Sequence, residues 1–598
     1  MKNYLKIKNV LNMKKVVSVG VIAGTLLGST SAFASSGVNQ KHVANSNQYG
    51  ASVALGTFIS QNQGAGDATG QFQTATHSFK TKEKQKASKT SVQLQGAAGA
   101  LISQNQGASK LSYQDQNATY DFKSKQKQSS KDSSLQGQGA LGALILQAQG
   151  SGSETGQYQN TSGAFNNQDQ SSKNKNAQLQ GALGVLIGQG QGSGNSNVQD
   201  QSAGGFGNSQ GQASVNKGAQ AQGALGALIG QLQGSANVGD QTQVATGAKN
   251  DQAQANVNVG SQGQAAGGLL IGQLQGSANS SSQYQDAYGY KNDQAQVNAT
   301  VTEQDQLALG AGILQAQGSA NDSVQNAVAD GKKNDQVQAA VGVTEQEQAA
   351  VGVGVVQGQG SANSTEQDAW AEGKYNNQAQ GSVDATSQAQ EGAFGASQGQ
   401  GSENATTQVA DTTGVANDQV QESANGTAQE QAGALGTDQE QASGNETVQV
   451  AVSTGVANDQ AQVAATETTQ VQAADCGADQ EQAAVTSTSQ EADATGVAND
   501  QAQVAVAETT QTQAGEGNVE QDQAAAEATS QSATTAGVNN NQTQAAETTT
   551  QQAQAASGSA KQRQAASSTK NQTATAVGAN ISQTQGSSSV VIQGQSAH

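Results

Sequence analysis

The sequence predicts an all-β fold, a long β-solenoid of stacked short strands with inward-facing glutamine ladders. Three observations predict this fold. A Gln-x-Gln motif recurs at constant spacing, charged residues flank these glutamines, and turn-forming residues separate the motifs. The composition agrees, because 598 residues include 73 Gly, no Pro and only 3% aromatic side chains. So few large apolar residues cannot fill several ordinary hydrophobic cores.

Residues 1–34 are typical of a secretory signal peptide. They contain five Lys and no acidic residue, an apolar run from Val16 to Leu27, and the small-x-small site Ala32-Phe33-Ala34. The run is shorter than the roughly 20 residues that span a bilayer. We therefore expect a secreted protein, located in the extracellular matrix or at the cell surface, with no membrane contact after cleavage.

The mature chain is expected to be strongly acidic. Without the five signal-peptide lysines, 22 of the 27 basic residues remain against 46 acidic ones, which gives a net charge of −24. Such a charge repels nucleic acid and anionic membranes, so neither is an expected partner.

A lead-in segment, residues 35–60, precedes thirteen tandem modules. The step between modules is 43 residues twice, then 42 five times, then 41 five times. The modules begin at Gln61, Gln104, Gln147, Gln189, Gln231, Gln273, Gln315, Gln357, Gln398, Gln439, Gln480, Gln521 and Gln562. A disordered Gln-rich tract would lose this phase, so the spacing favours a structural repeat.

Each module carries four Gln-x-Gln-like stations, and alternation along a strand puts both glutamines of a Gln-x-Gln pair on one face. Charged residues flank the pairs, as at Asp251, Glu303 and Arg563, so the pairs should face inward and the charges outward. Small residues would fill the remaining inward positions. The expected ladder residues of one module and the start of the next are Gln231, Gln233, Gln241, Gln243, Gln252, Gln254, Gln262, Gln264, Gln273 and Gln275.

Turn-forming residues lie between the pairs, for example Gly234 to Asn237 and Thr246 to Asn250. Each interval then predicts a strand of about five or six residues followed by a tight turn. Buried amides become tolerable when they stack, because each ladder bond avoids an unsatisfied group that costs about 1–3 kcal/mol.

Two coil geometries fit the spacing. Alternating steps of 10 and 11 residues favour a 21-residue coil of two strands, which gives 26 coils and a rod of roughly 120 Å at the usual strand spacing. Stacking of whole 42-residue modules favours instead a four-sided coil.

The repeats divide into two parts. Modules in residues 61–397 contain aromatic residues and Leu, whereas residues 398–598 are acidic and rich in Thr and Ala. Lysines concentrate in the early modules. In the early modules a Leu lies three residues before the first Gln, on the same face as the charges, which predicts an exposed apolar stripe. The alternative is that the strand twists there and buries both faces. These leucines are Leu101, Leu144, Leu186, Leu228 and Leu270.

The sequence lacks the motifs of several common enzyme chemistries. It has no GxSxG, phosphate-binding glycine loop or HExxH motif, and its histidines, His42, His77 and His598, are far apart. Cys476 stands alone, and Asn250-Asp251 is better explained by turn initiation than by calcium binding. We expect no enzyme activity, no cofactor and no metal.

The motif from Gln231 to Asn237, QxQGxxN, together with the two-strand period, resembles the curlin repeat proteins that form curli amyloid fibres. The resemblance covers most of residues 61–595, although a second Gln replaces the Gly of the curlin motif. It implies a structural subunit of an extracellular, amyloid-like fibre or biofilm matrix.

The first functional hypothesis is therefore self-assembly through end-to-end strand pairing, because the repeat continues to Gln595 with no space for a cap. Other matrix or cell-surface components are possible further partners. The alternative is a monomeric cell-surface adhesin or spacer rod. An ice-binding solenoid would need a flat array of Thr-like side chains, and the outward positions vary from Leu to Asp.

Overall fold

A computed structural model of the chain describes residues 39–597 apart from short gaps. The gaps are 56–57, 77–81, 123–124, 166, 250, 292, 333–334, 375–376, 393–395, 416–417, 434–437, 457–458, 476–478, 498–499, 517–518, 539–540, 558–559 and 580–581. The expected signal peptide, Cys476, His77 and His598 lie outside the described residues.

The described residues form 25 strands and no helix, so the all-β solenoid is confirmed. The strands are β1 (Asn39–Leu55), β2 (Phe58–Thr76), β3 (Lys82–Phe122), β4 (Lys125–Ala164), β5 (Asn167–Leu183), β6 (Leu186–Phe206), β7 (Ser209–Leu225), β8 (Leu228–Ala248), β9 (Asp251–Gly267), β10 (Leu270–Tyr290), β11 (Asp293–Gly310), β12 (Gly312–Lys332), β13 (Asp335–Gly352), β14 (Val355–Lys374), β15 (Asn377–Gly392), β16 (Ala396–Val415), β17 (Asp418–Gly433), β18 (Asp438–Val456), β19 (Asp459–Asp475), β20 (Asp479–Val497), β21 (Asp500–Glu516), β22 (Val519–Val538), β23 (Asn541–Ser557), β24 (Ala560–Ala579) and β25 (Ser582–Ala597).

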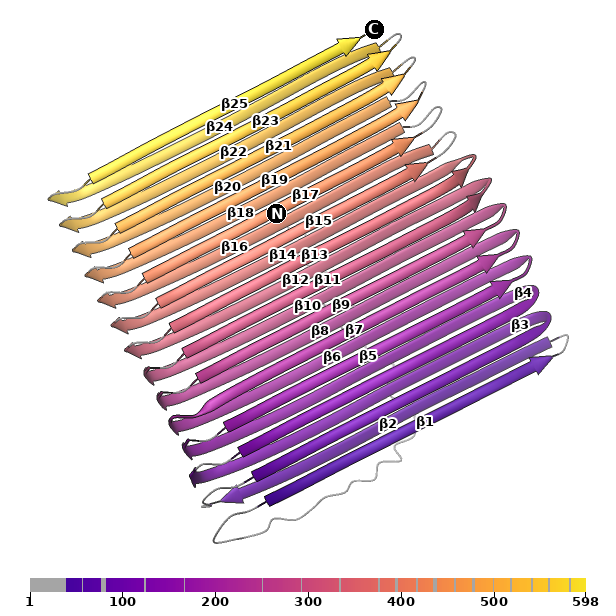
Figure 1. Cartoon of the computed structure of the whole chain (residues 1–598), viewed down its shortest axis with the longest axis horizontal. Helices are drawn as coiled ribbons and strands as arrows, with labels where there is room; N and C mark the ends of the chain where they lie inside the picture. The colour runs from indigo at the N-terminus through magenta and orange to yellow at the C-terminus, as the bar shows by residue number, and fades with distance from the viewer. Residues whose placement is uncertain are drawn as a thin grey trace, which may run out of the picture.

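The strands form two layers, with all pairing parallel (Figure 1). The odd layer contains the odd-numbered strands from β5 onward, the even layer the even-numbered strands from β6 onward. β1 joins the odd layer and β2 the even layer, while β3 and β4 each pass through both layers. The solenoid thus already begins in β1, inside the segment expected to be a lead-in.

Each coil comprises one module of 41–43 residues, 42 in the middle of the chain, and two long strands. Leu228 of β8 pairs with Leu270 of β10, and Asp251 of β9 pairs with Asp293 of β11. The prediction of two strands per coil is correct, but the preferred 21-residue coil is wrong. The alternative length of 42 residues is right, although the coil has two sides rather than four.

The error came from the segment Gly234 to Asn237, which was predicted to be a turn. It lies inside β8, where Ser235 and Asn237 point inward and are buried while Ala236 between them faces outward. The strands after β4 are therefore 16–21 residues long. Each repeats the glutamine motif twice, but in the even strands from β12 to β24 the second motif keeps only its first Gln, as at Gln325. The turn predicted at Thr246 to Asn250 is correct, because β8 ends at Ala248 and β9 begins at Asp251.

Long strands change the overall shape from the expected rod to a flat slab (Figure 1). A 17-residue strand such as β9 spans about 56 Å, and the thirteen even-layer strands span about 58 Å at the usual spacing. The slab is two layers thick.

Side chains alternate strictly between the interior and the surface, as the burial of β9 shows residue by residue. One end of the interior is apolar. Two residues before each module's first Gln, a stack of buried Ile continues into Val355 and Ala396. Its members are Ile102, Ile145, Ile187, Ile229, Ile271 and Ile313. The rest of the interior combines polar side chains with buried Ala, such as Ala340 and Ala464.

Candidate functional site

The ten predicted ladder glutamines all lie in the interior, at most 5% exposed. Each donates a hydrogen bond of 2.8–3.0 Å from its Nε2 to Oε1 of the equivalent glutamine one coil earlier, as Gln231 does to Gln189. The inward glutamine ladders are thus confirmed, and all ten bonds point the same way along the stack.

The second N–H of the amide explains why the side chain is Gln. Gln243 also donates to the backbone oxygen of Ala253 in the facing layer, at 3.1 Å, and Gln254 to that of Tyr284, at 3.3 Å. Ala253 points outward between two glutamines of β9, which leaves its carbonyl accessible from inside. A Gln reaches this carbonyl and satisfies both amide hydrogens, so the two layers are joined by hydrogen bonds.

The centre of the even strands from β6 to β18 carries a second type of ladder, made of Asn, that the sequence reasoning missed. Asn195, Asn237 and Asn279 are linked by bonds of 2.9 Å, but each Nδ2 donates to the following coil. Asn279 also donates to Oγ1 of Thr302 in the facing layer. Farther along the same ladder, Asn404 donates both to a side chain, Oγ1 of Thr427, and to the backbone oxygen of Gly426. The signal was present, because an Asn stands six residues after the first Gln of several modules.

We predict that charge is poorly tolerated at Gln254 and well tolerated at its neighbour Ala253, which is exposed. Gln254→Glu removes two donors and buries a carboxylate, which should cost on the order of 3 kcal/mol. Ala253→Glu keeps the ladder and adds the same charge at the surface. Thermal melting of both variants measures the difference, and equal loss would mean that the assigned faces are reversed.

The first coils bury a cluster of charged side chains instead of amides. Lys89 stacks on Asp132 in the odd layer, and Asp67 stacks on Lys110 in the even layer. Lys89 and Asp132 are each 1% exposed. The Nζ of Lys89 donates to the backbone oxygens of Asp67 and Leu111. Desolvation lowers the pKa of Lys110 to about 8 and raises that of Asp132, while the opposite charges partly compensate.

Farther along, the carboxylate of Asp384 is buried at the centre of the slab. Asp384 accepts hydrogen bonds from the hydroxyls of Thr365, at 3.2 Å, and Thr406, at 3.1 Å. Gly342 precedes it in the same column, and a Cβ there would lie 2.5 Å from Oδ1 of Asp384. Burial raises the pKa of Asp384 to about 6, and the two hydroxyls only partly oppose this shift.

We predict that the coils around Asp384 lose stability as the pH rises from about 4 to about 6. Because the folded state holds the proton more tightly than the unfolded state, the neutral form is favoured at low pH. The penalty above pH 6 is about 3 kcal/mol, at about 1.4 kcal/mol per pH unit between the ordinary and the raised pKa. Hydrogen exchange of β15 amides, corrected for intrinsic rates, measures this loss.

The matched variant is Asp384→Asn, since Asn already occupies this column at Asn425. It should remove the pH dependence and protect β15 more than the native residue does at pH 7.5. If the native β15 is equally protected at pH 4.5 and pH 7.5, Asp384 does not control local stability.

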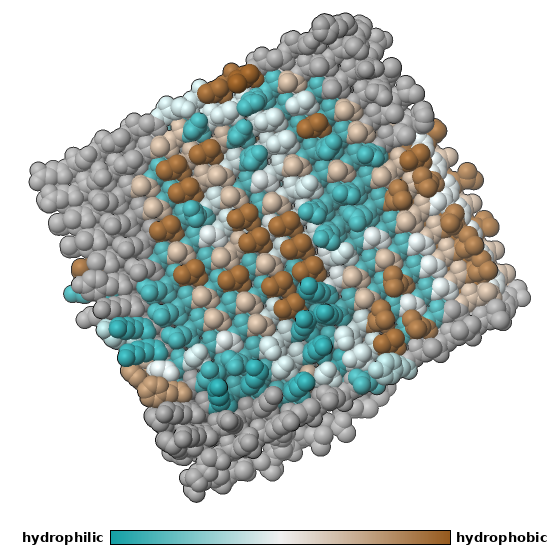
Figure 2. Space-filling view, in the orientation of Figure 1, coloured by the Kyte–Doolittle hydropathy of each residue, from teal (hydrophilic) through white to brown (hydrophobic). Residues whose placement is uncertain are grey.

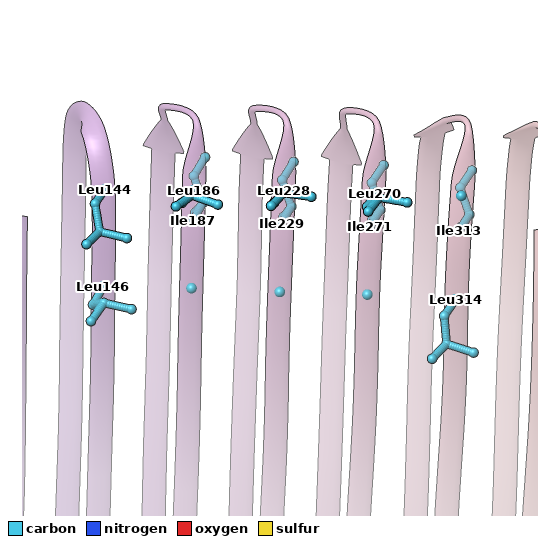
Figure 3. Close-up of a pocket in the computed structure, with 14 residues that line it drawn as sticks. Leu144, Leu146, Leu186, Ile187, Leu228, Ile229, Leu270, Ile271, Ile313 and Leu314 are labelled. Atoms are coloured by element: carbon cyan, nitrogen blue, oxygen red, sulfur yellow. The ribbon is translucent and has the colours of Figure 1, made fainter.

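The outer face of the even layer carries a shallow apolar groove of about 700 Å³ (Figure 3). Its floor is formed by Gly188, Gly230 and Gly272, one residue before each module's first Gln, and Leu146 and Leu314 close its ends. One side is lined by the leucines of the predicted stripe, Leu144, Leu186, Leu228 and Leu270.

The predicted apolar stripe is therefore present and exposed. Leu228 is 41% and Leu270 is 56% exposed, while the neighbouring Ile229 is buried on the inner face. Further exposed apolar residues line the narrow side of the slab where odd strands turn into even strands, seen at the right margin of Figure 2. They include Leu141, Leu183, Leu225, Leu309, Val351 and Val353.

Charge is distributed differently on the two outer faces. On the odd layer, seven exposed lysines gather on β3, β4, β5 and β7, namely Lys86, Lys125, Lys127, Lys131, Lys173, Lys175 and Lys217. From β11 to β23, the exposed charges described on this face are all acidic, twelve in number. They are Asp293, Glu303, Asp305, Asp335, Glu345, Glu347, Glu391, Glu422, Glu430, Glu467, Glu508 and Glu547. The even layer is acidic already in early coils, at Glu154 and Asp240.

Within the described residues, no group of three or more His, Cys, Asp or Glu side chains could hold a metal ion. The same part of the chain has no helix long and apolar enough to span a bilayer. Comparison with protein families, with curated proteins and with solved structures finds no match to this chain.

Proposed function

We propose that the mature chain is a secreted structural protein that self-assembles by end-to-end stacking into extracellular, amyloid-like fibres of a biofilm matrix or cell surface. The observation that carries the proposal is the strand edge. In the described part of the chain, β24 pairs only with β22 and β25 only with β23, which leaves their outer edges without a partner strand. Unpaired edges template further strand pairing.

The first coil matches the last in strand length, and its even strand also matches in glutamine position. β24 has 20 residues and β2 has 19, while β25 has 16 and β1 has 17. When Gln562 of one chain is placed beside Gln61 of the next, Gln564 meets Gln63 and Gln572 meets Gln71. Three glutamine columns of the even layer could then continue from copy to copy. In the odd layer, Gln40 of β1 stands in a glutamine column, while His42, Gly50 and Ser52 occupy the other three.

Ladder polarity supports stacking in one direction only. Described glutamines donate towards the N-terminal coils, as Gln552 does to Gln511. A following copy would offer amide donors at its first coil, and the preceding copy would offer amide oxygens at its last. The exposed apolar groove and margin give such a fibre surfaces for other matrix components. A monomeric adhesin or spacer remains the alternative outcome of the test below.

Purified mature protein should form unbranched fibres with a meridional reflection at about 4.7–4.8 Å, because the strands would lie across the fibre axis. X-ray fibre diffraction and electron microscopy measure both features. Gln585→Lys, in β25 and in register with Gln544 of β23, should block growth at that end while monomers keep their β-structure. A native chain that stays monomeric at high concentration, with intact β-structure, would favour the spacer.

Charge should speed the joining of ends, since lysines concentrate in early coils and acids in later ones. Exposed ion pairs contribute only about 0–1 kcal/mol and are screened over about 8–10 Å at physiological salt, so the effect is on rate. Replacing Lys80, Lys82, Lys84 and Lys86 with Gln should slow seeded elongation at low salt and change little at high salt. Faster elongation of native protein in high salt would show that self-repulsion dominates instead.

A further inference from the structure

The outer face of the odd layer has a charge pattern that becomes complementary to itself when one copy is inverted. Parallel, in-register pairing divides this face into columns, each containing the equivalent outward residue of successive coils. Lys175 and Lys217 belong to the same column as Glu467 and Glu508. The early end of the column is basic and its late end is acidic.

The strand β13 lies midway between these charges. Lys217 is three strands before Val343 of β13, and Glu467 is three strands after it. Lys175 and Glu508 are each four strands away. In a second column, centred on Val341, Lys131 and Glu547 are each five strands away.

We propose that two copies of the chain pack face to face through their odd layers, related by a two-fold axis that runs parallel to the strands through β13. This axis reverses the order of the strands but keeps each column opposite itself. It therefore places Lys131 opposite Glu547, Lys175 opposite Glu508 and Lys217 opposite Glu467, each pair occurring twice.

The remaining exposed lysines also face compatible residues in this arrangement. Lys125 faces Asn541 and Lys127 faces Thr543, both in β23, while Lys173 faces Val506 in β21. Lys86 faces Gly586 in β25. None of the seven lysines faces another lysine. A two-fold axis along the stack would instead place the lysine-bearing coils opposite each other.

The middle of the face is apolar, as a buried interface centre requires. Val297, Val337, Val341 and Val383 of β11, β13 and β15 are 39–49% exposed. The eleven strands from β4 to β23 offer roughly 2,500 Å² of flat surface, against about 800 Å² per partner in a typical stable complex.

Some acids oppose this pairing. Asp335, Glu345 and Glu347 of β13 lie at the axis and face their own copies, and Asp251 faces Asp418. The arrangement therefore makes a gain-of-function prediction. Glu345→Gln with Glu347→Gln should tighten face-to-face pairing, whereas the matched change on the even layer, Glu403→Gln with Glu446→Gln, should not.

Zero-length carbodiimide cross-linking, which joins a lysine amine directly to a carboxylate, distinguishes this packing from end-to-end stacking. Within one chain, Lys175 and Glu508 are eight strand spacings apart, about 38 Å, and between stacked chains about 29 Å. Mass spectrometry of the cross-linked mature protein should recover Lys175 joined to Glu508 and Lys217 joined to Glu467. Dimers or paired filaments that lack both cross-links would overturn the proposal.

A charge exchange supplies the second test. Lys175→Glu with Lys217→Glu should reduce dimer formation at least tenfold in sedimentation, or separate paired filaments under the microscope. Adding Glu467→Lys and Glu508→Lys restores the native net charge and should restore pairing. Failure of the fourfold variant to recover, although its β-structure is native, would contradict the two-fold arrangement while leaving end-to-end growth unaffected.

Discussion

The structure depends on one interaction, the in-register stacking of buried amides. A glutamine between two layers has two N–H donors and a carbonyl that all need partners. Gln243 meets this need by bonding to Gln201 in the previous coil and to the backbone of Ala253 across the interior. These bonds require parallel strands, exact register and a fixed distance between layers. The long flat strands, the regular coil and the slab shape all follow from this requirement.

The register is so constraining that changes in module length occur outside the ladders. Ala350 pairs with Gly392 and Val355 with Ala396, so the first 41-residue module lost its residue in the turn after an odd strand. A longer early module has its extra residue at an irregularity between Ala118 and Asp121 of β3. The glutamine columns continue unbroken through both changes. Residues are therefore lost or gained only where the chain does not contribute to a glutamine ladder.

The sequence alone predicted two strands per coil and the inward position of the glutamines. The glutamine positions could be predicted because the charged residues beside Gln252 and Gln304 must face water. It could not predict the coil length. Gly-Ser-Ala-Asn at 234–237 has the composition of a turn, and only tertiary pairing shows that Ser235 and Asn237 form part of the interior. Both coil geometries share steps of 10 and 11 residues. The apolar groove also depends on coil length, because Gly188, Gly230 and Gly272 lie side by side only when whole modules stack.

Uniform ladders do not determine the order in which the coils stack, because the amides of a coil could form the same hydrogen bonds with any other coil. The buried charges oppose such slippage. Lys89 beneath Asp132, and Asp67 beneath Lys110, favour one order of the first coils. A shift by one coil would place Lys89 against Asn174 and Asp67 against Ser153, which leaves buried charges without opposite charges. Asp384 and Gly342 act similarly in the middle, where the carboxylate needs a neighbour without a side chain. These buried charges lower stability but give the coils a unique alignment. The outer columns of charge need that alignment, because they form a defined surface only when the coils stack in one order.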